Sequence, residues 1–168
     1  MLHYVKNLRR LRRILWGIVL VLLLAIFLFS AQSGDQSGDT STKITRFIMR
    51  LFHADFADMP DKEQVALLEK WNFLIRKCAH FTEYAVLAFA FCLLLHTYPL
   101  KKRALLAWIG ATAYAATDEI HQLSVAERTG SVWDVLLDSG GALFGIIAAV
   151  FLIRRWRRKR AANTEGKP

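Results

Sequence analysis

A polar stretch between two apolar segments, Thr117 to Gly145, reads TDEIHQLSVAERTGSVWDVLLDSGGALFG. Its ionisable and amide side chains are Asp118, Glu119, His121, Gln122, Glu127, Arg128, Asp134 and Asp138. An earlier apolar segment opens in the same way, with His80 and Glu83. Placing a charged group in an apolar environment costs free energy. The location of these charged residues beside apolar segments therefore needs an explanation.

Composition indicates a membrane protein. The 168 residues are 54% hydrophobic and 12% aromatic, and the mean hydropathy is +0.26, which is high for a soluble domain. The net charge is +9, but the Lys and Arg residues cluster at 6–13, 101–103 and 154–160, each beside an apolar run. Basic residues in such places set topology and attract anionic lipid headgroups. We therefore expect membrane lipids as partners, and no nucleic acid.

The first apolar run, residues 14–34, is uncharged and follows a basic N-terminus. About 20 such residues cross the hydrocarbon core as a helix. A secretory signal peptide is the alternative, but its apolar region is usually only about 7–15 residues long, and no small-x-small cleavage site follows here. We predict a retained transmembrane helix over 14–33.

The other uncharged segments are shorter, at 84–100, 104–117 and 139–153. A 14-residue helix like the second of these reaches only about 21 Å, against a hydrocarbon core of about 30 Å. Each must therefore extend toward its ionisable residues in order to span. The predicted spans are 79–99, 104–122 and 133–153, and they place the acids and histidines at a membrane boundary.

Residues 34–77 form the predicted extracytoplasmic segment. A Gly/Ser-rich polar exit from the membrane extends to Thr42. From Lys43 to His53, apolar residues recur at helical spacing: Ile44, Phe47, Ile48, Leu51 and Phe52. This pattern favours a short helix in the membrane interface, or equally one packed on the other helices. A mixed helix from Asp61 toward Lys77 can continue into the second span.

The basic clusters give the orientation. With basic residues kept inside, four spans result, both termini and the tail 154–168 are cytoplasmic, and the acids and histidines meet at the outer face. The predicted fold is all-α: a single domain, 1–168, with a four-transmembrane-helix bundle and short interfacial helices between the first and second spans.

Helical spacing aligns the polar residues. Arg76, His80 and Glu83 share one face, as do Asp118 and His121. In the last span one stripe carries the pairs Asp134/Asp138 and Gly141/Gly145, and a G-x-x-x-G pair lets a neighbouring helix approach closely. The carboxylates thus lie on the inward face, as a polar site between helices requires. Glu119 points about 100° away from Asp118, and its role stays open.

These residue types suit acid–base chemistry, anion binding or metal binding. The candidate catalytic residues are His80, Glu83, Asp118, His121, Asp134 and Asp138. The candidate substrate-binding residues are Arg76, Lys77, Gln122, Arg128, Gln32 and Ser33. A divalent metal is conceivable but not favoured, because no H-E-x-x-H or similar ligand spacing occurs, and no cofactor is assigned. A purely structural salt-bridged network is the alternative.

Three motifs resemble the VanZ-like family of bacterial integral membrane proteins, which is named from a teicoplanin-resistance protein. Ser30 to Ser37 read SAQSGDQS, Arg76 to Phe89 read RKCAHFTEYAVLAF, and the third motif runs from Asp118 to Gly145. The sequence departs from the family pattern at Ala126-Glu127, where Pro-Gly is frequent, which bears on the turn that presents Arg128. The matching residues are Arg76, Lys77, His80, Glu83, Asp118, Glu119, His121, Gln122, Arg128, Asp134 and Asp138.

The resemblance implies a multi-pass protein of the bacterial cytoplasmic membrane but no particular reaction. Three functions remain in view: an enzyme acting at the outer leaflet on a lipid-linked or cell-wall substrate, a non-catalytic binder of an envelope lipid or glycopeptide, and a transporter or proton relay. The last is least supported, because the helices below the polar cluster are apolar apart from His96. The sequence sets no oligomeric state.

Overall fold

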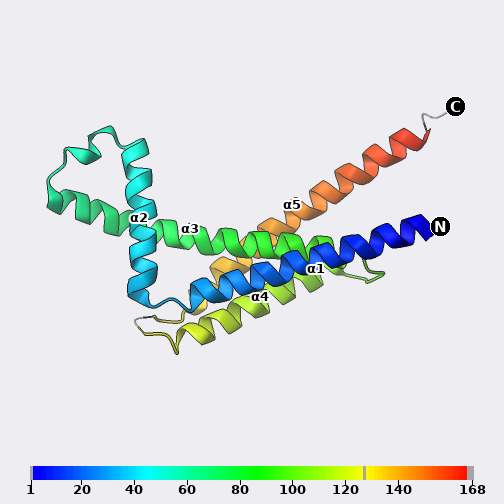
Figure 1. Ribbon diagram of the computed structural model, residues 1–168, viewed down its shortest axis with the longest axis horizontal. Coiled ribbons are helices and arrows are strands. Elements are labelled where there is room, and N and C mark those ends of the chain that lie inside the picture. The colour runs from blue at the N-terminus through cyan, green and yellow to red at the C-terminus, as the bar shows by residue number, and fades with distance from the viewer. Residues whose placement is uncertain (1, 127, 166–168) are drawn as a thin grey trace.

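The structure, a computed structural model, describes residues 2–126 and 128–165 (Figure 1). Glu127 and the last three residues of the predicted tail lie outside the described part. The described chain is helical, without strands, as predicted. Its elements are α1 (Leu2–Ser30), α2 (Gly34–Phe52), the 3-10 turn η1 (Ala54–Ala57), α3 (Asp61–Leu95), α4 (Arg103–Gln122) and α5 (Val132–Glu165).

Of the helices described, three are long and apolar enough to cross a membrane, in α1, α3 and α5. They cover Lys6–Ser30, Asp61–Leu95 and Val132–Lys159. The 20-residue α4 is not among them, because its last two turns carry Asp118, Glu119, His121 and Gln122 in place of apolar residues. Three of the four predicted spans therefore fall on helices that are long and apolar enough to cross a membrane.

α3 is the centre of the molecule and contacts α1, α2, α4 and α5. Figure 1 shows both termini and the 96–102 turn at one end of the helices, which we call the basic end. The end of α1 and the 123–131 connection lie at the other end, which we call the polar end. The basic clusters at 6–13, 101–103 and 154–159 thus share one end of the bundle, and the polar stretch lies at the opposite end.

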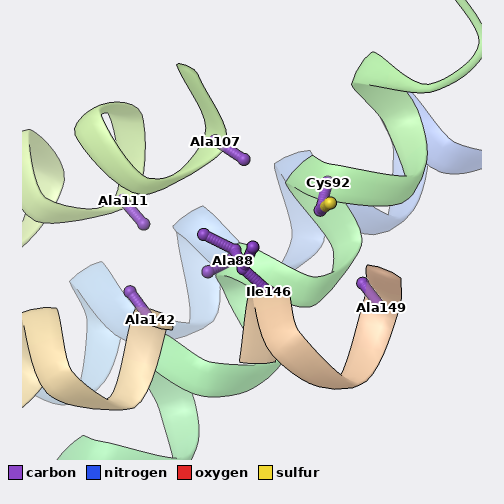
Figure 2. Close-up of a cluster of buried hydrophobic side chains, with 7 residues drawn as sticks. All are labelled: Ala88, Cys92, Ala107, Ala111, Ala142, Ile146 and Ala149. Atoms are coloured by element: carbon purple, nitrogen blue, oxygen red, sulfur yellow. The ribbon is translucent and has the colours of Figure 1, made fainter. Parts of the chain in front are cut away.

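Small residues hold α3, α4 and α5 together. Figure 2 shows a buried cluster in which side chains from the three helices meet: Ala88, Cys92, Ala107, Ala111, Ala142, Ile146 and Ala149. Small side chains let helix backbones approach closely. Lipid is as apolar as the side chains, so the hydrophobic effect does not drive helices together in a membrane, and close packing does so instead. The predicted glycine stripe fits this packing. A Cβ at Gly141 would collide with the Phe81 carbonyl oxygen, and a Cβ at Gly145 with that of Ala85.

The polar exit predicted up to Thr42 is wrong, because α2 is helical from Gly34. Hydroxyl groups fill hydrogen-bonding roles within the helix: Ser41 Oγ donates to the Ser37 carbonyl at 2.6 Å, and Thr45 Oγ1 to the Ser41 carbonyl at 2.8 Å. Ser41, Thr45 and Met49 are buried on the side of α2 that meets α3. Asn72 of α3 donates to Thr42 Oγ1 at 2.9 Å. Packing on α3 thus stabilises a sequence of low helix propensity.

The apolar residues predicted on this helix do not all face the protein. Ile48 is half-buried beside Met49, whereas Ile44, Phe47 and Leu51 are exposed. In Figure 1, α2 (cyan) lies across the direction of the other helices. The helix therefore presents an apolar face away from α3.

The predicted mixed helix and the second span form one continuous α3. It ends at Leu95, four residues before the predicted boundary. Pro99 explains the early end, since proline lacks an amide hydrogen and disfavours helical backbone at the preceding residue.

Candidate functional site

Four elements bring the predicted residues to the polar end. Those with a described place there are Arg76, Lys77, His80 and Glu83 on α3, Asp118, His121 and Gln122 on α4, Arg128 in the connection, and Asp134 and Asp138 on α5. Their charges interact across the helices. His80 interacts with Asp118 and Arg128, and Glu83 interacts with the same two residues.

Asp118 and Asp138 are two buried carboxylates that lie between the helices. Asp138 is 0% exposed and Asp118 5% exposed. Gln122, one turn further along α4, donates from Nε2 to Asp118 Oδ2 at 3.3 Å. The fully buried Tyr84 ring of α3 lies beside Asp118 and Asp138, but no hydrogen bond of regular geometry satisfies its hydroxyl. The two carboxylates therefore lie near one another, buried where α3, α4 and α5 meet.

Two acids of the cluster have fixed partners. Asp134 Oδ1 forms an ion pair with Lys77 Nζ, and both side chains are half-buried. Glu119 Oε2 accepts a hydrogen bond from the Ser131 backbone amide at 2.8 Å, just before α5 begins. Gly130 lies tight against the same turn, since a Cβ there would stand 2.6 Å from the Glu119 carbonyl oxygen. Glu119 thus holds the start of α5 in place, and Lys77 with Asp134 joins α3 to α5.

Arg128 closes the site on the side of α1. Its guanidinium donates to the Phe29 carbonyl at 3.3 Å, near the end of α1. Burial and the neighbouring Arg76 lower the pKa of Arg128, while Asp118, Glu119 and Glu83 act in the opposite direction. α1 also contributes Phe27, whose ring stacks on His121 with centroids 4.9 Å apart.

Many buried polar atoms of this cluster have no hydrogen-bond partner. Within the described residues, all but one of the buried, unpaired side-chain atoms lie at the polar end: Ser30 Oγ, His80 Nδ1, Tyr84 OH, His121 Nε2, Arg128 Nε, and Asp138 Oδ1 and Oδ2. Buried polar groups are nearly always paired. These atoms belong to six residues, which come from four helices and from the connection before α5.

Some site residues escaped sequence reasoning. Gln32 and Ser33 lie half-buried between α1 and α2, but it is Ser30 that contributes a buried, unpaired hydroxyl. The sequence did contain a signal for Tyr84, because Tyr84 lies one helical turn after His80 and so shares its face of the helix. No sequence signal indicates that Phe27 covers His121.

The cluster offers acid–base groups and cations. No group of three His, Cys, Asp or Glu residues in the described ranges lies so as to hold a metal ion, and we assign no metal ligands. The paired residues join the helices, and the unpaired ones lie buried between them.

These features define a multi-pass membrane protein: apolar helices of spanning length packed through small residues, with a buried polar cluster at one end. The VanZ/LLP1 family model matches residues 15–154, so the chain belongs to the VanZ/LLP1 family. The resemblance seen in the sequence motifs is thereby confirmed. Searches of curated proteins and of solved structures give no significant match.

Proposed function

We propose that the polar end forms a site at the outer leaflet of the bacterial cytoplasmic membrane, where the protein acts on a lipid-linked or cell-wall substrate. One observation carries this proposal: the unpaired, buried polar atoms of Ser30, His80, Tyr84, His121, Arg128 and Asp138 gather at one end of apolar helices. A site there meets both the hydrocarbon and the water, which suits a molecule with a lipid tail and a polar head.

The proposed orientation has four spans, with α4 as the third. α4 has 20 residues, enough for about 30 Å. Its polar residues Asp118, Glu119 and Gln122 are buried in the protein, so they need not face lipid. The basic end then lies in the cytoplasm with both termini. α2, lying across the bundle (Figure 1), rests in the outer interface with Phe47 and Leu51 toward the lipid.

Cysteine labelling tests this orientation. In a background with the exposed Cys78 replaced by serine, Ser124→Cys should react with a membrane-impermeant maleimide in intact cells, because Ser124 is exposed at the polar end. Lys101→Cys at the basic end should react only after permeabilisation. The reverse pattern would place the polar site in the cytoplasm and refute the outer-leaflet proposal.

The chemistry we propose is hydrolysis or transfer at a phosphate or sugar of the substrate head. Arg128, with Arg76 nearby, provides positive charge for an anionic head. Asp138, His80 and His121 supply unpaired acid–base atoms.

The direct test is purified protein with a fluorescent lipid-linked cell-wall precursor that carries a diphosphate. We expect a time-dependent product that wild-type protein forms and an Asp118→Ala, His80→Ala double variant does not. Deletion of the protein should increase teicoplanin susceptibility in cells whose resistance to teicoplanin depends on this protein. If the protein neither turns over the precursor nor binds it saturably, the proposed substrate class is refuted.

The second candidate is a non-catalytic binder of an envelope lipid or glycopeptide. It is favoured by the fixed partners of Asp134 and Glu119, which leave fewer carboxylates for chemistry. Saturable binding of the same precursor without product would select the binder over the enzyme.

A further inference from the structure

A second site lies at the basic end, where α1, α3 and α5 enclose an apolar groove of about 730 Å³. In Figure 1, α1 and α5 run apart here toward the two termini. The apolar lining comes from all three helices: Leu8, Leu11 and Leu15 of α1, Leu93 of α3, and Leu152 and Trp156 of α5. Its volume falls within the range of about 300–1,000 Å³ that is typical of small-molecule sites. None of the residues assigned above to the polar site lines this groove.

The rim of the groove is polar and cationic. Arg157 lines the groove itself, whereas Arg154 and Arg158 line a separate hollow on α5. His96 and Thr97 add polar groups at the end of α3. The neighbouring Arg12 is already engaged, since its guanidinium donates to the Thr97 carbonyl and lies 4.1 Å from the Tyr98 ring centroid.

The segments of chain that line the groove contain no carboxylate side chain for these arginines. Residues 1–34, 84–117 and 139–164, which include the groove lining, contain no Asp or Glu, and Glu165 follows seven residues after Arg158. The cations of α5 therefore have no anionic partner within these segments. The groove can accept an acyl chain, and the arginine beside it can accept an anionic head. Both features suit a phospholipid with a charged head.

We propose that this groove binds one anionic phospholipid, with an acyl chain along the leucines and the phosphate beside Arg157. The apolar lining favours the chain by removing its surface from water or disordered lipid. Basic side chains near a membrane surface favour an anionic lipid over a zwitterionic one by about fivefold each. This site is independent of the polar end and of any reaction there.

Native mass spectrometry of the full chain, reconstituted with phosphatidylglycerol and phosphatidylcholine, tests the proposal. We expect one phosphatidylglycerol to remain bound per protein after mild detergent removal, with little phosphatidylcholine. Arg157→Gln should reduce the retained lipid about fivefold, while the exposed Arg13→Gln on α1, which does not line the groove, should not. Leu152→Trp, which fills the groove, should abolish retention, while Leu20→Trp on an exposed part of α1 should leave it unchanged.

Several results would overturn it. Equal retention of both lipids would show that charge does not select the ligand. Equal losses in Arg157→Gln and Arg13→Gln would reduce the effect to general surface attraction. A protein dimer that loses its contact in Leu152→Trp would make a second copy the occupant of the groove. Unfolding temperatures of all variants within a few degrees of wild type ensure that the losses report binding.

Discussion

Gly145→Leu is expected to abolish folded protein in the membrane. Any Cβ at this position meets the Ala85 carbonyl oxygen of α3, and the obstacle is backbone, so the two helices must separate. Overpacking a core typically costs about 1–3 kcal/mol. Separation of α3 from α5 also opens the cluster around Ala142 and Ile146. We expect at least a tenfold loss of monodisperse protein, measured by size-exclusion chromatography of a fluorescent fusion.

Gly17→Leu is the matched control. A Cβ at Gly17 has nothing within 4 Å. Glycine is less favourable than alanine in a helix by about 0.8–1 kcal/mol, and leucine ranks close to alanine. This variant should accumulate like wild type and unfold at the same temperature or slightly higher. Equal yields of the two variants would contradict the close approach of α3 and α5.

Asp138→Asn should reduce turnover of the lipid-linked precursor at least a hundredfold, while the protein still accumulates. The substitution keeps the size of a fully buried side chain and removes only its charge and its acid–base capacity. Loss of a general acid or base costs about 10²–10⁴ in rate. Both carboxylate oxygens of Asp138 are buried without a hydrogen-bond partner, so the charge is not needed to hold another helix. The measurements are product formation by purified protein and teicoplanin susceptibility of cells.

Asp55→Asn in η1 is the control, because Asp55 is exposed and far from the polar cluster in sequence. It should retain full turnover. If Asp138→Asn is as active as wild type, Asp138 serves only packing. If it disappears from the membrane while Asp55→Asn accumulates, the cluster is structural, and the proposed site loses its main support.

Hydropathy and helical spacing were sufficient for much of the fold. They predicted the all-helical chain, the glycine stripe of α5 and the gathering of basic segments at one end. They failed at residues 34–42, where single-residue propensities favour a loop. The helix there depends on contacts far apart in sequence, such as the one between Thr42 and Asn72, and no local pattern contains them.

The site, like the fold, has features that the sequence could predict and features that it could not. A face shared within one helix, such as that of His80 and Glu83, follows from spacing alone. Which atoms meet between helices depends on how each helix is rotated and how far it slides. For this reason the sequence could place Glu119 near the cluster but could not show that it holds the Ser131 amide. The stacking of Phe27 on His121 had no sequence signal for the same reason.

The polar end of α4 also constrains how the protein is made. Acidic residues at the centre of a helix raise its insertion cost by about 2.5–3.5 kcal/mol each, and less near the interface. Asp118 and Glu119 are buried only because α3 and α5 surround them. A ribosome that has released only α4 presents the translocon with a weak insertion signal. In the four-span arrangement proposed above, we therefore expect stable integration of α4 to wait for α5, so that the two helices enter the bilayer as a hairpin beside α3.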